Sequence, residues 1–276
     1  MKSHPITFTL IQICIFTLMI NTGACQVPKR SKSASEIFSD VKVAALADAA
    51  ASGKVDEIDR LIKNGVTIDG LSKHGMTPLL FALSKKNLRG AEALLKAGAN
   101  PNHAIESPSE IGGRPMILLF ITTDAVDIVE LLLKYGANPN TRNPEKVNGN
   151  DFNVGQSLLY QAVMYKPMVN LLVKYGADVN LKSLESESPL ASAAGLGQLD
   201  VVDFLLDHGA NDFDALAQSL QERIWGESIE PHRLAILRRL HKQGVKIYAA
   251  EQTPQTPADL ISPGKWRHIG LEEQRK

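Results

Sequence analysis

Short apolar segments with helical spacing recur along the chain, and each one is followed by a glycine. The apolar positions fall within Ala93–Leu95, Val129–Leu133, Val169–Leu172 and Val201–Leu206. Apolar residues three or four positions apart lie on one face of an α-helix. The glycines that follow are typical of a helix that ends on a residue in the left-handed conformation, and they are Gly98, Gly136, Gly176 and Gly209. The pattern therefore predicts a series of amphipathic helices that pack through one face.

These glycines belong to an internal repeat. Related short segments begin at Gly65, Gly98, Gly136, Gly176, Gly209 and Gly244, with intervals of 33 to 40 residues. Thr77-Pro78 and Ser188-Pro189 each follow such a glycine by 12 residues, and Thr256-Pro257 does the same. Thr or Ser before Pro is typical of an N-cap followed by proline at the first helical position. Arg114 and Ser157 hold this place after longer loops. Because Arg114 cannot cap a helix as threonine does, we expect its helix to start less stably by about 1 kcal/mol.

Glycines and helix starts phased at this period resemble the ankyrin repeat family, from about Val41 to Leu260. The resemblance implies an all-α solenoid of helix–turn–helix repeats with finger loops, with about six repeats and a partial C-terminal cap. We assign residues 41–250 to the solenoid and residues 251–276 to a partial repeat and a C-terminal tail. The third full repeat lacks two residues between its helices, at Met164-Tyr165-Lys166-Pro167.

The first 24 residues indicate an export signal. Lys2 precedes a charge-free stretch from Ile6 to Ile20, which is shorter than the roughly 20 apolar residues of a membrane span. The segment Thr22-Gly23-Ala24-Cys25 resembles the lipobox of bacterial lipoproteins, although Thr22 stands where leucine is usual. The resemblance implies removal of residues 1–24 and lipidation of Cys25, and Gln26 favours the outer membrane. Ordinary cleavage that leaves a free periplasmic protein is the alternative. Residues 25–40 are polar, which predicts a flexible tether.

Composition narrows the classes of function. The 30 basic and 30 acidic residues give a formal net charge of zero, which argues against broad electrostatic binding of nucleic acid. Both cysteines, Cys14 and Cys25, precede the repeats, so the repeats hold no disulfide and no cysteine-based metal site. No GxSxG, HExxH, phosphate-loop or CxxC pattern occurs, and no two histidines are three or four residues apart. We therefore expect no enzyme activity, no metal and no cofactor.

The variable positions of the family imply a candidate partner-binding surface on the concave face. Two adjacent finger loops are enlarged here, and insertions in repeat proteins often map to one binding face. The candidate finger positions are Lys73, His74, Met76, Ile111, Phe152 and Val154, and the candidate first-helix positions are Lys85, Met164, Tyr165 and Leu196. Aromatic residues and methionine on such a face suit a protein partner, although Ile111 and Phe152 could instead pack within their own loops.

The sequence thus predicts a monomeric, non-catalytic protein-binding module of the bacterial envelope, anchored in the outer membrane through Cys25. One interpretation is an inhibitor or immunity-type protein that captures an antibacterial effector such as a lipase. Some type VI secretion immunity proteins are similar in combining a lipoprotein signal with repeats. A second interpretation is a scaffold or stabilising partner for a resident periplasmic enzyme. A divergent enzyme or small-molecule receptor is the third.

Overall fold

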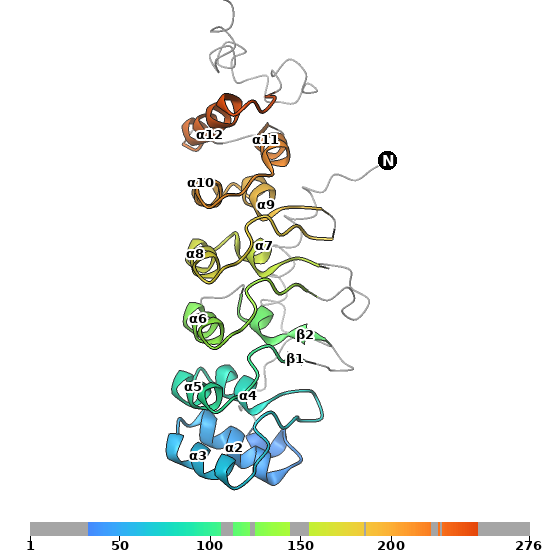
Figure 1. Ribbon diagram of the computed structural model, residues 1–276, viewed down its shortest axis with the longest axis vertical. Helices are drawn as coiled ribbons and strands as arrows, with labels where there is room; N and C mark the ends of the chain where they lie inside the picture. Colours follow the sequence, from blue (N-terminus) through green and yellow to red (C-terminus); the bar gives the residue numbers. More distant parts are fainter. Residues whose placement is uncertain are drawn as a thin grey trace, which may run out of the picture.

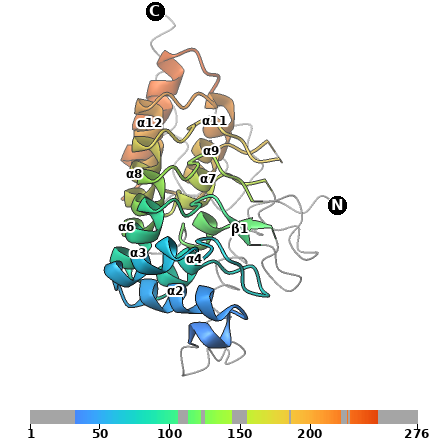
Figure 2. The same cartoon turned by 60° about the horizontal axis from the view of Figure 1, so that its bottom comes forward.

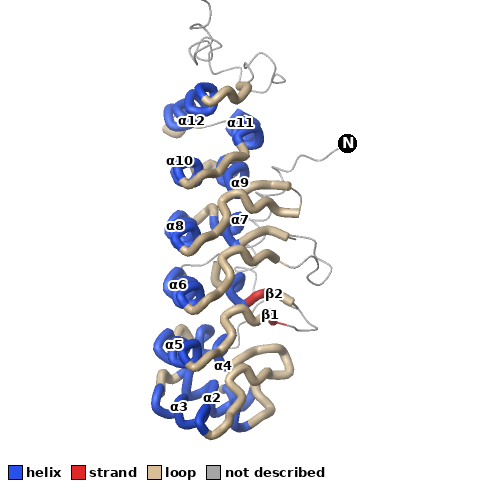
Figure 3. Tube along the Cα trace, viewed as in Figure 1, coloured by secondary structure: helices blue, strands red, loops and turns tan. Residues whose placement is uncertain are grey.

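Antiparallel helix pairs stack along one axis into an elongated solenoid. The computed structural model describes residues 33–105, 113–121, 125–143, 155–184, 186–221, 226 and 228–247. In Figure 1 the first helix of each pair lies in one column and the second helix in another, while the loops that join successive pairs project to one side. The turned view in Figure 2 and the tube in Figure 3 show the same separation of helices and loops. The expected all-α ankyrin solenoid is confirmed.

Six helix pairs form the described part of the stack. The first helices are α2 (Val41–Ala51), α4 (Pro78–Ser84), the 3-10 helix η2 (Met116–Leu119), α7 (Leu158–Ala162), α9 (Pro189–Gly195) and α11 (Phe213–Gln221). The second helices are α3 (Val55–Lys63), α5 (Leu88–Lys96), α6 (Val126–Lys134), α8 (Lys166–Lys174), α10 (Leu199–Asp207) and α12 (Glu230–Lys242). The 3-10 helix η1 (Ala34–Glu36) precedes them, and a short antiparallel pair joins β1 (Ala104–Ile105) to β2 (Arg114–Pro115).

Side-chain caps start the first helices where the sequence predicts them. Thr77 Oγ1 accepts a hydrogen bond from the backbone N–H of Leu80 at 3.1 Å, and Ser188 Oγ does the same for Ala191 at 3.1 Å. Arg114 provides no such cap. It pairs in β2 instead, and the helix after it is the 3-10 helix η2, which has no side-chain cap. This first helix thus starts without a side-chain cap, and the expected loss of stability remains a prediction.

Glycine ends the second helices, as expected. Gly98 has a φ of 99°, and a left-handed residue of this kind is inexpensive only for glycine. Its N–H donates to the carbonyl of Leu95 at 3.1 Å, and the N–H of Ala99 donates to Leu94 at 3.0 Å. These two bonds satisfy carbonyl groups that the helix end leaves open, in the arrangement of a Schellman motif. The same geometry recurs at the other phased glycines of the described chain.

The core runs between the two helix columns through every described repeat. At least one leucine from each helix pair is fully buried at the centre of this core, and such side chains are Leu46, Leu94, Leu132, Leu172, Leu205 and Leu237. Each buried leucine stabilises the fold by roughly 1.5–3 kcal/mol. Small residues let neighbouring helices come close: a Cβ added at Gly90 in α5 would lie 1.8 Å from the carbonyl oxygen of Ala50 in α2.

The solenoid begins before Val41, so the expected tether of residues 25–40 is too long. Ala34 and Phe38 are buried, and the Phe38 ring meets the Phe81 ring edge-on with 6.0 Å between their centroids. The backbone N–H of Ala34 also donates to Asp48 Oδ1 at 3.2 Å. Residues 33–40 therefore cover the end of the first repeat, because its apolar face has no preceding repeat to pack against. Residues 25–32 lie outside the described residues, as do the export signal and the C-terminal segment 251–276.

The two residues missing from the third full repeat are taken from its first helix and not from the turn. Helix α7 has five residues, whereas α4 and α9 have seven. Three residues separate the first helix from the second in all three of these repeats. The turn keeps its length because it must reverse the chain, so the shorter spacing removes part of a helical turn from α7.

Polar side chains at the bases of the finger loops link each repeat to the next. Asn140 Oδ1 accepts from the backbone N–H of Asp178 at 2.8 Å, and its amide nitrogen donates to the carbonyl of Gly176 at 3.4 Å. Two other asparagines make the same pair of bonds to the repeat that follows them, Asn102 and Asn180. These bonds fix the spacing of the fingers along the stack.

Candidate functional site

A tight loop presents the first candidate finger residues. Ser72 Oγ accepts hydrogen bonds from the backbone N–H groups of His74 at 3.2 Å and Met76 at 3.0 Å. The N–H of Ser72 donates to the carbonyl of Met76 at 2.9 Å, and Gly75 adopts a φ of 72° to close the loop. Lys73 and His74 are consequently exposed, while Met76 is half-buried. We call Lys73, His74 and Met76 the finger group.

The four candidates expected in first helices lie in the turns between helices. Lys85 is the C-cap of α4 and Leu196 the C-cap of α9, and both are half-buried. Helix α7 ends at Ala162, so Met164 and Tyr165 follow it in the turn to α8. We call Lys85, Met164, Tyr165 and Leu196 the turn group. The position shift at Met164 and Tyr165 follows from the shortening of α7.

Met164 and Tyr165 are the most exposed apolar members of the turn group. Their exposed fractions are 51% and 38%. The backbone around them is held in place: the Tyr165 N–H donates to the carbonyl of Ala162 at 2.8 Å, and the Tyr165 carbonyl accepts from Met168 at 2.9 Å. Lys166 and Pro167 beside them are also exposed. This turn thus displays an aromatic ring and a thioether on a fixed backbone.

The finger group and the turn group lie at opposite ends of the first helices. A first helix begins at the base of a finger and ends at the turn, so its length separates the two groups. Seven residues at 1.5 Å each give a separation of about 10 Å. Either group is small, and a partner has to reach across the first helices to contact both. Ile111, Phe152 and Val154 lie outside the described residues, as does Cys25.

A further exposed finger residue was missed by the sequence analysis. Ser183 repeats the role of Ser72: its N–H donates to the carbonyl of Glu187 at 2.8 Å, and its Oγ accepts from the Glu187 N–H at 3.1 Å. Ser186 has a φ of 66° where the earlier finger uses Gly75. Leu184 therefore occupies the place of Lys73, and 55% of it is exposed. The signal available in the sequence was the matching serine, four residues before Met76 and Glu187.

The described residues were compared with the requirements of a metal site and of a membrane-spanning helix. Over the ranges that the structure places, no cluster of three or more His, Cys, Asp or Glu side chains could hold a metal ion. No helix in those ranges is long and apolar enough to cross a bilayer. The features that stand out are exposed side chains on rigid loops, which are suited to contact with another macromolecule.

Comparisons with known proteins agree with this architecture. Residues 118–215 match a family model described as ankyrin repeats (3 copies), and residues 46–95 match one described as ankyrin repeats (many copies). The chain is 31% identical over 96 residues to the ankyrin repeat, SAM and basic leucine zipper domain-containing protein 1 of Carollia perspicillata. It has the same identity over the same length to the protein of that name from Dasypus novemcinctus.

The matched segment is 32% of this chain and spans only 18% of the length of these two relatives. The likeness to these two relatives therefore covers about a third of this chain. Ankyrin repeats mediate protein–protein interaction, and the exposed finger and turn residues fit that general role. On its sequence periodicity, its helix pairs and its matches, the chain belongs to the ankyrin repeat family.

Proposed function

We propose that this chain is an envelope lipoprotein that captures another protein, as an inhibitor or immunity-type partner of an antibacterial effector such as a lipase. One observation carries the binding role: Met164 and Tyr165 are exposed on a turn whose backbone is fixed by hydrogen bonds. Aromatic and methionine side chains are enriched at protein interfaces. A rigid display of them lowers the entropy that binding must overcome.

The finger group supplies the second half of the proposed surface. Lys73 and His74 are exposed on a closed loop, and Leu184 extends the row to another finger. A partner that spans the first helices would meet apolar contacts at the turns and mixed contacts at the fingers. A partner that contacts both groups would also cover the first helices between them, and an inhibitor needs such a continuous contact to block an active site.

The envelope location is supported by the N-terminal sequence alone. Lys2, the charge-free stretch to Ile20 and the small residues before Cys25 form the export and lipidation signal. A lipid on Cys25 would hold the repeats at a membrane surface and raise the local concentration of a partner that arrives there. We expect Cys25→Ala to abolish labelling by a clickable fatty acid and to release the chain from membranes. Membrane association that persists in this variant would contradict the proposal.

The function is tested by affinity capture from envelope and secreted fractions, followed by an activity assay of the partner that is recovered. An effector that binds stoichiometrically and loses its activity on binding would support the immunity role. A resident enzyme that remains active would contradict it and favour the scaffold interpretation. Deletion of the gene should leave cells sensitive to the effector, and unchanged resistance would equally contradict the immunity role.

Tyr165→Ala tests the surface. Tyrosine is enriched among the interface residues whose truncation to alanine costs more than about 1 kcal/mol, so we expect at least about a fivefold loss of affinity. Tyr175→Ala is the matched control, because Tyr175 is the partly buried C-cap of α8 at the other end of that helix. Phe152→Ala examines the enlarged finger. Unchanged affinity in the Tyr165 and Phe152 variants, with helical circular dichroism intact, would show that the partner binds elsewhere.

A further inference from the structure

Three second helices, α5, α6 and α8, are joined by a ladder of two ion pairs on the side of the stack away from the fingers. Lys134 Nζ in α6 lies 3.1 Å from Glu92 Oε1 in α5, and Lys174 Nζ in α8 lies 3.0 Å from Glu130 Oε1 in α6. In each pair the carboxylate comes six residues before the glycine that ends its own helix, and the lysine comes two residues before the next such glycine. Each glutamate thus faces the helix that follows it in the stack.

The last second helix reverses the charge at one place of this ladder. In α12, Arg238 stands six residues before Gly244, at the place of the ladder glutamates, and Lys242 stands two residues before it. Both side chains are exposed. By the geometry of the earlier pairs, Arg238 faces the place that a following second helix would take. Such a helix would need a carboxylate where α5, α6 and α8 carry lysine.

The carboxylates closest to α12 are engaged with other cations. Asp207 Oδ1 of α10 lies 3.0 Å from Arg239 Nη1, and Asp203 Oδ2 lies 2.6 Å from His232 Nε2. Within α12, Glu230 is paired with Arg233. Among the residues that the structure describes, no carboxylate pairs with Arg238 or Lys242. Within the described part of the chain, Arg238 and Lys242 therefore give this face of α12 positive charge that no carboxylate pairs with.

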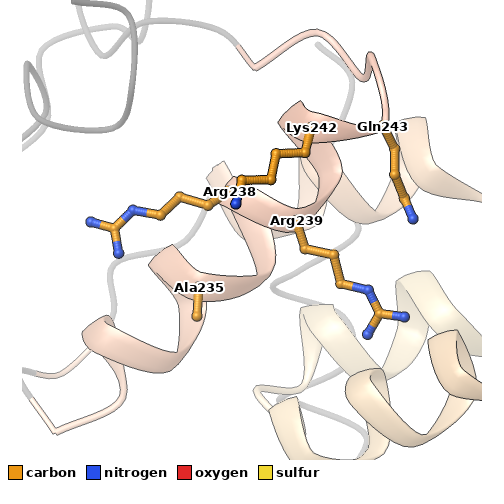
Figure 4. Close-up of a pocket in the computed structure, with 5 residues that line it drawn as sticks. All are labelled: Ala235, Arg238, Arg239, Lys242 and Gln243. Carbon is orange, nitrogen blue, oxygen red and sulfur yellow. The ribbon is translucent and has the colours of Figure 1, made fainter. Parts of the chain in front are cut away.

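A shallow hollow of about 490 Å³ lies on this face. Ala235, Arg238, Arg239, Lys242 and Gln243 line it. They stand at positions i, i+3, i+4, i+7 and i+8, so their backbone positions follow one stripe along α12, with Arg238 and Arg239 at its two edges. In Figure 4, Arg239 extends toward the neighbouring helix and Arg238 extends to the opposite side. Ala235 is the small residue among these long side chains, so another backbone can approach α12 closely there.

We propose that this face of α12 binds an acidic helix of a partner protein. Arg238 and Lys242 are one helical turn apart, which matches two glutamates at positions i and i+4 of a facing helix. In the ladder, the lysine two residues before its glycine pairs with a carboxylate of the preceding helix, with nitrogen–oxygen distances of 3.0 and 3.1 Å. In α12 the equivalent carboxylate of the preceding helix, Asp203, is paired with His232 instead. Figure 4 shows the Lys242 side chain extending toward Arg238, so both cations are presented on the same face. This charged surface at the end of the stack is separate from the finger and turn groups, so it does not depend on the function proposed above.

The test is the binding of a fluorescein-labelled, alanine-rich peptide of about 18 residues, a length sufficient for measurable helix. The peptide carries glutamates at i and i+4, and a matched peptide carries glutamine there. We expect fluorescence anisotropy to show binding of the glutamate peptide that weakens as salt rises, and no binding of the glutamine peptide. Reversal of both charges in R238E/K242E should weaken binding about tenfold, since each exposed pair contributes up to about fivefold.

The matched control is K63E/K166E, which reverses two exposed lysines in α3 and α8. It should change the affinity by less than about twofold, because Lys63 and Lys166 lie on other helices. Equal losses in the two variants would overturn the proposal, as would binding of the glutamine peptide. Inorganic phosphate and vesicles of phosphatidylglycerol with phosphatidylcholine are tested on the same variants. The proposal would also be overturned if phosphate or the vesicles bound to the parent protein and not to R238E/K242E, while the glutamate peptide did not bind.

Discussion

Replacing Gly90 by alanine should destabilise the protein, although it improves the helix that contains it. Within a helix, alanine is favoured over glycine by about 1 kcal/mol. At Gly90, however, the new Cβ would stand 1.8 Å from the carbonyl oxygen of Ala50 and 2.6 Å from its carbonyl carbon. Since contacts under 3.0 Å are essentially never observed for a Cβ, α5 must move away from α2 by more than 1 Å.

The cost follows from this displacement. Forcing an extra methyl group into a packed core costs about 1–3 kcal/mol, and the upper end applies because the obstacle is backbone that cannot rotate away. After subtracting the gain in helix propensity, we expect G90A to lower the free energy of unfolding by about 2 kcal/mol. With an m value of about 2 kcal/mol per M, the midpoint of urea unfolding, followed by circular dichroism, should fall by about 1 M.

Gly195 provides the matched control. It ends α9, it has no positive φ, and a Cβ added there would meet no atom within 4 Å. We therefore expect G195A to be neutral or to raise the free energy of unfolding by about 0.5 kcal/mol. A G90A protein that is as stable as the parent would refute the close approach of α5 to α2. Equal destabilisation by both substitutions would refute crowding as the cause.

Two other substitutions test charged contacts. Arg233 is 1% exposed, pairs with Glu230 and donates to the carbonyl of Leu220 at 3.0 Å. R233M should therefore lower the free energy of unfolding by about 3 kcal/mol and accelerate hydrogen exchange in α11 and α12. Unchanged hydrogen exchange would contradict this prediction. Hydrogen bonds from Lys134 and the Tyr135 hydroxyl hold the pKa of Glu92 below its usual value of 4.5. The Glu92 carboxylate therefore stabilises the fold above pH 4.5, and this stabilisation is lost as the pH falls through the lowered pKa. The urea midpoint of E92Q should therefore fall less than that of the parent between about pH 6 and about pH 3, and parallel curves would contradict the assignment.

The features that could be predicted from sequence are those in which one residue type dictates local geometry. Thr77 and Ser188 before proline predict capped helix starts, because few other residues accept a bond from the third helical N–H. Gly98 predicts a left-handed helix end, because other residues pay a steric cost there. The absence of a capping residue at Arg114 likewise predicted the poor helix that follows it.

Features that depend on contacts between distant segments could not be predicted. Arg233 lies in a basic helix, where an arginine is expected in solvent, yet it is buried and donates to the carbonyl of Leu220, 13 positions earlier, as well as to the carboxylate of Glu230. Phe38 follows a polar stretch, yet its ring packs against Phe81, 43 positions further along the chain. The positions of the candidate residues Met164 and Tyr165 could not be predicted for a similar reason. The two missing residues near Tyr165 could belong to the helix or to the turn, and only the packed structure assigns them to α7.

The asparagine links between fingers have a consequence for how the chain can change in length. Asn102 and Asn140 occupy equivalent places and bind equivalent backbone groups of the repeat that follows each. Removing one whole unit between them would leave the same partners in register, whereas removing a single residue would displace a donor from its acceptor. The molecule can therefore lengthen or shorten in whole repeats without redesigning its joints. Its reach is modular, while the surface that each unit displays remains open to independent variation.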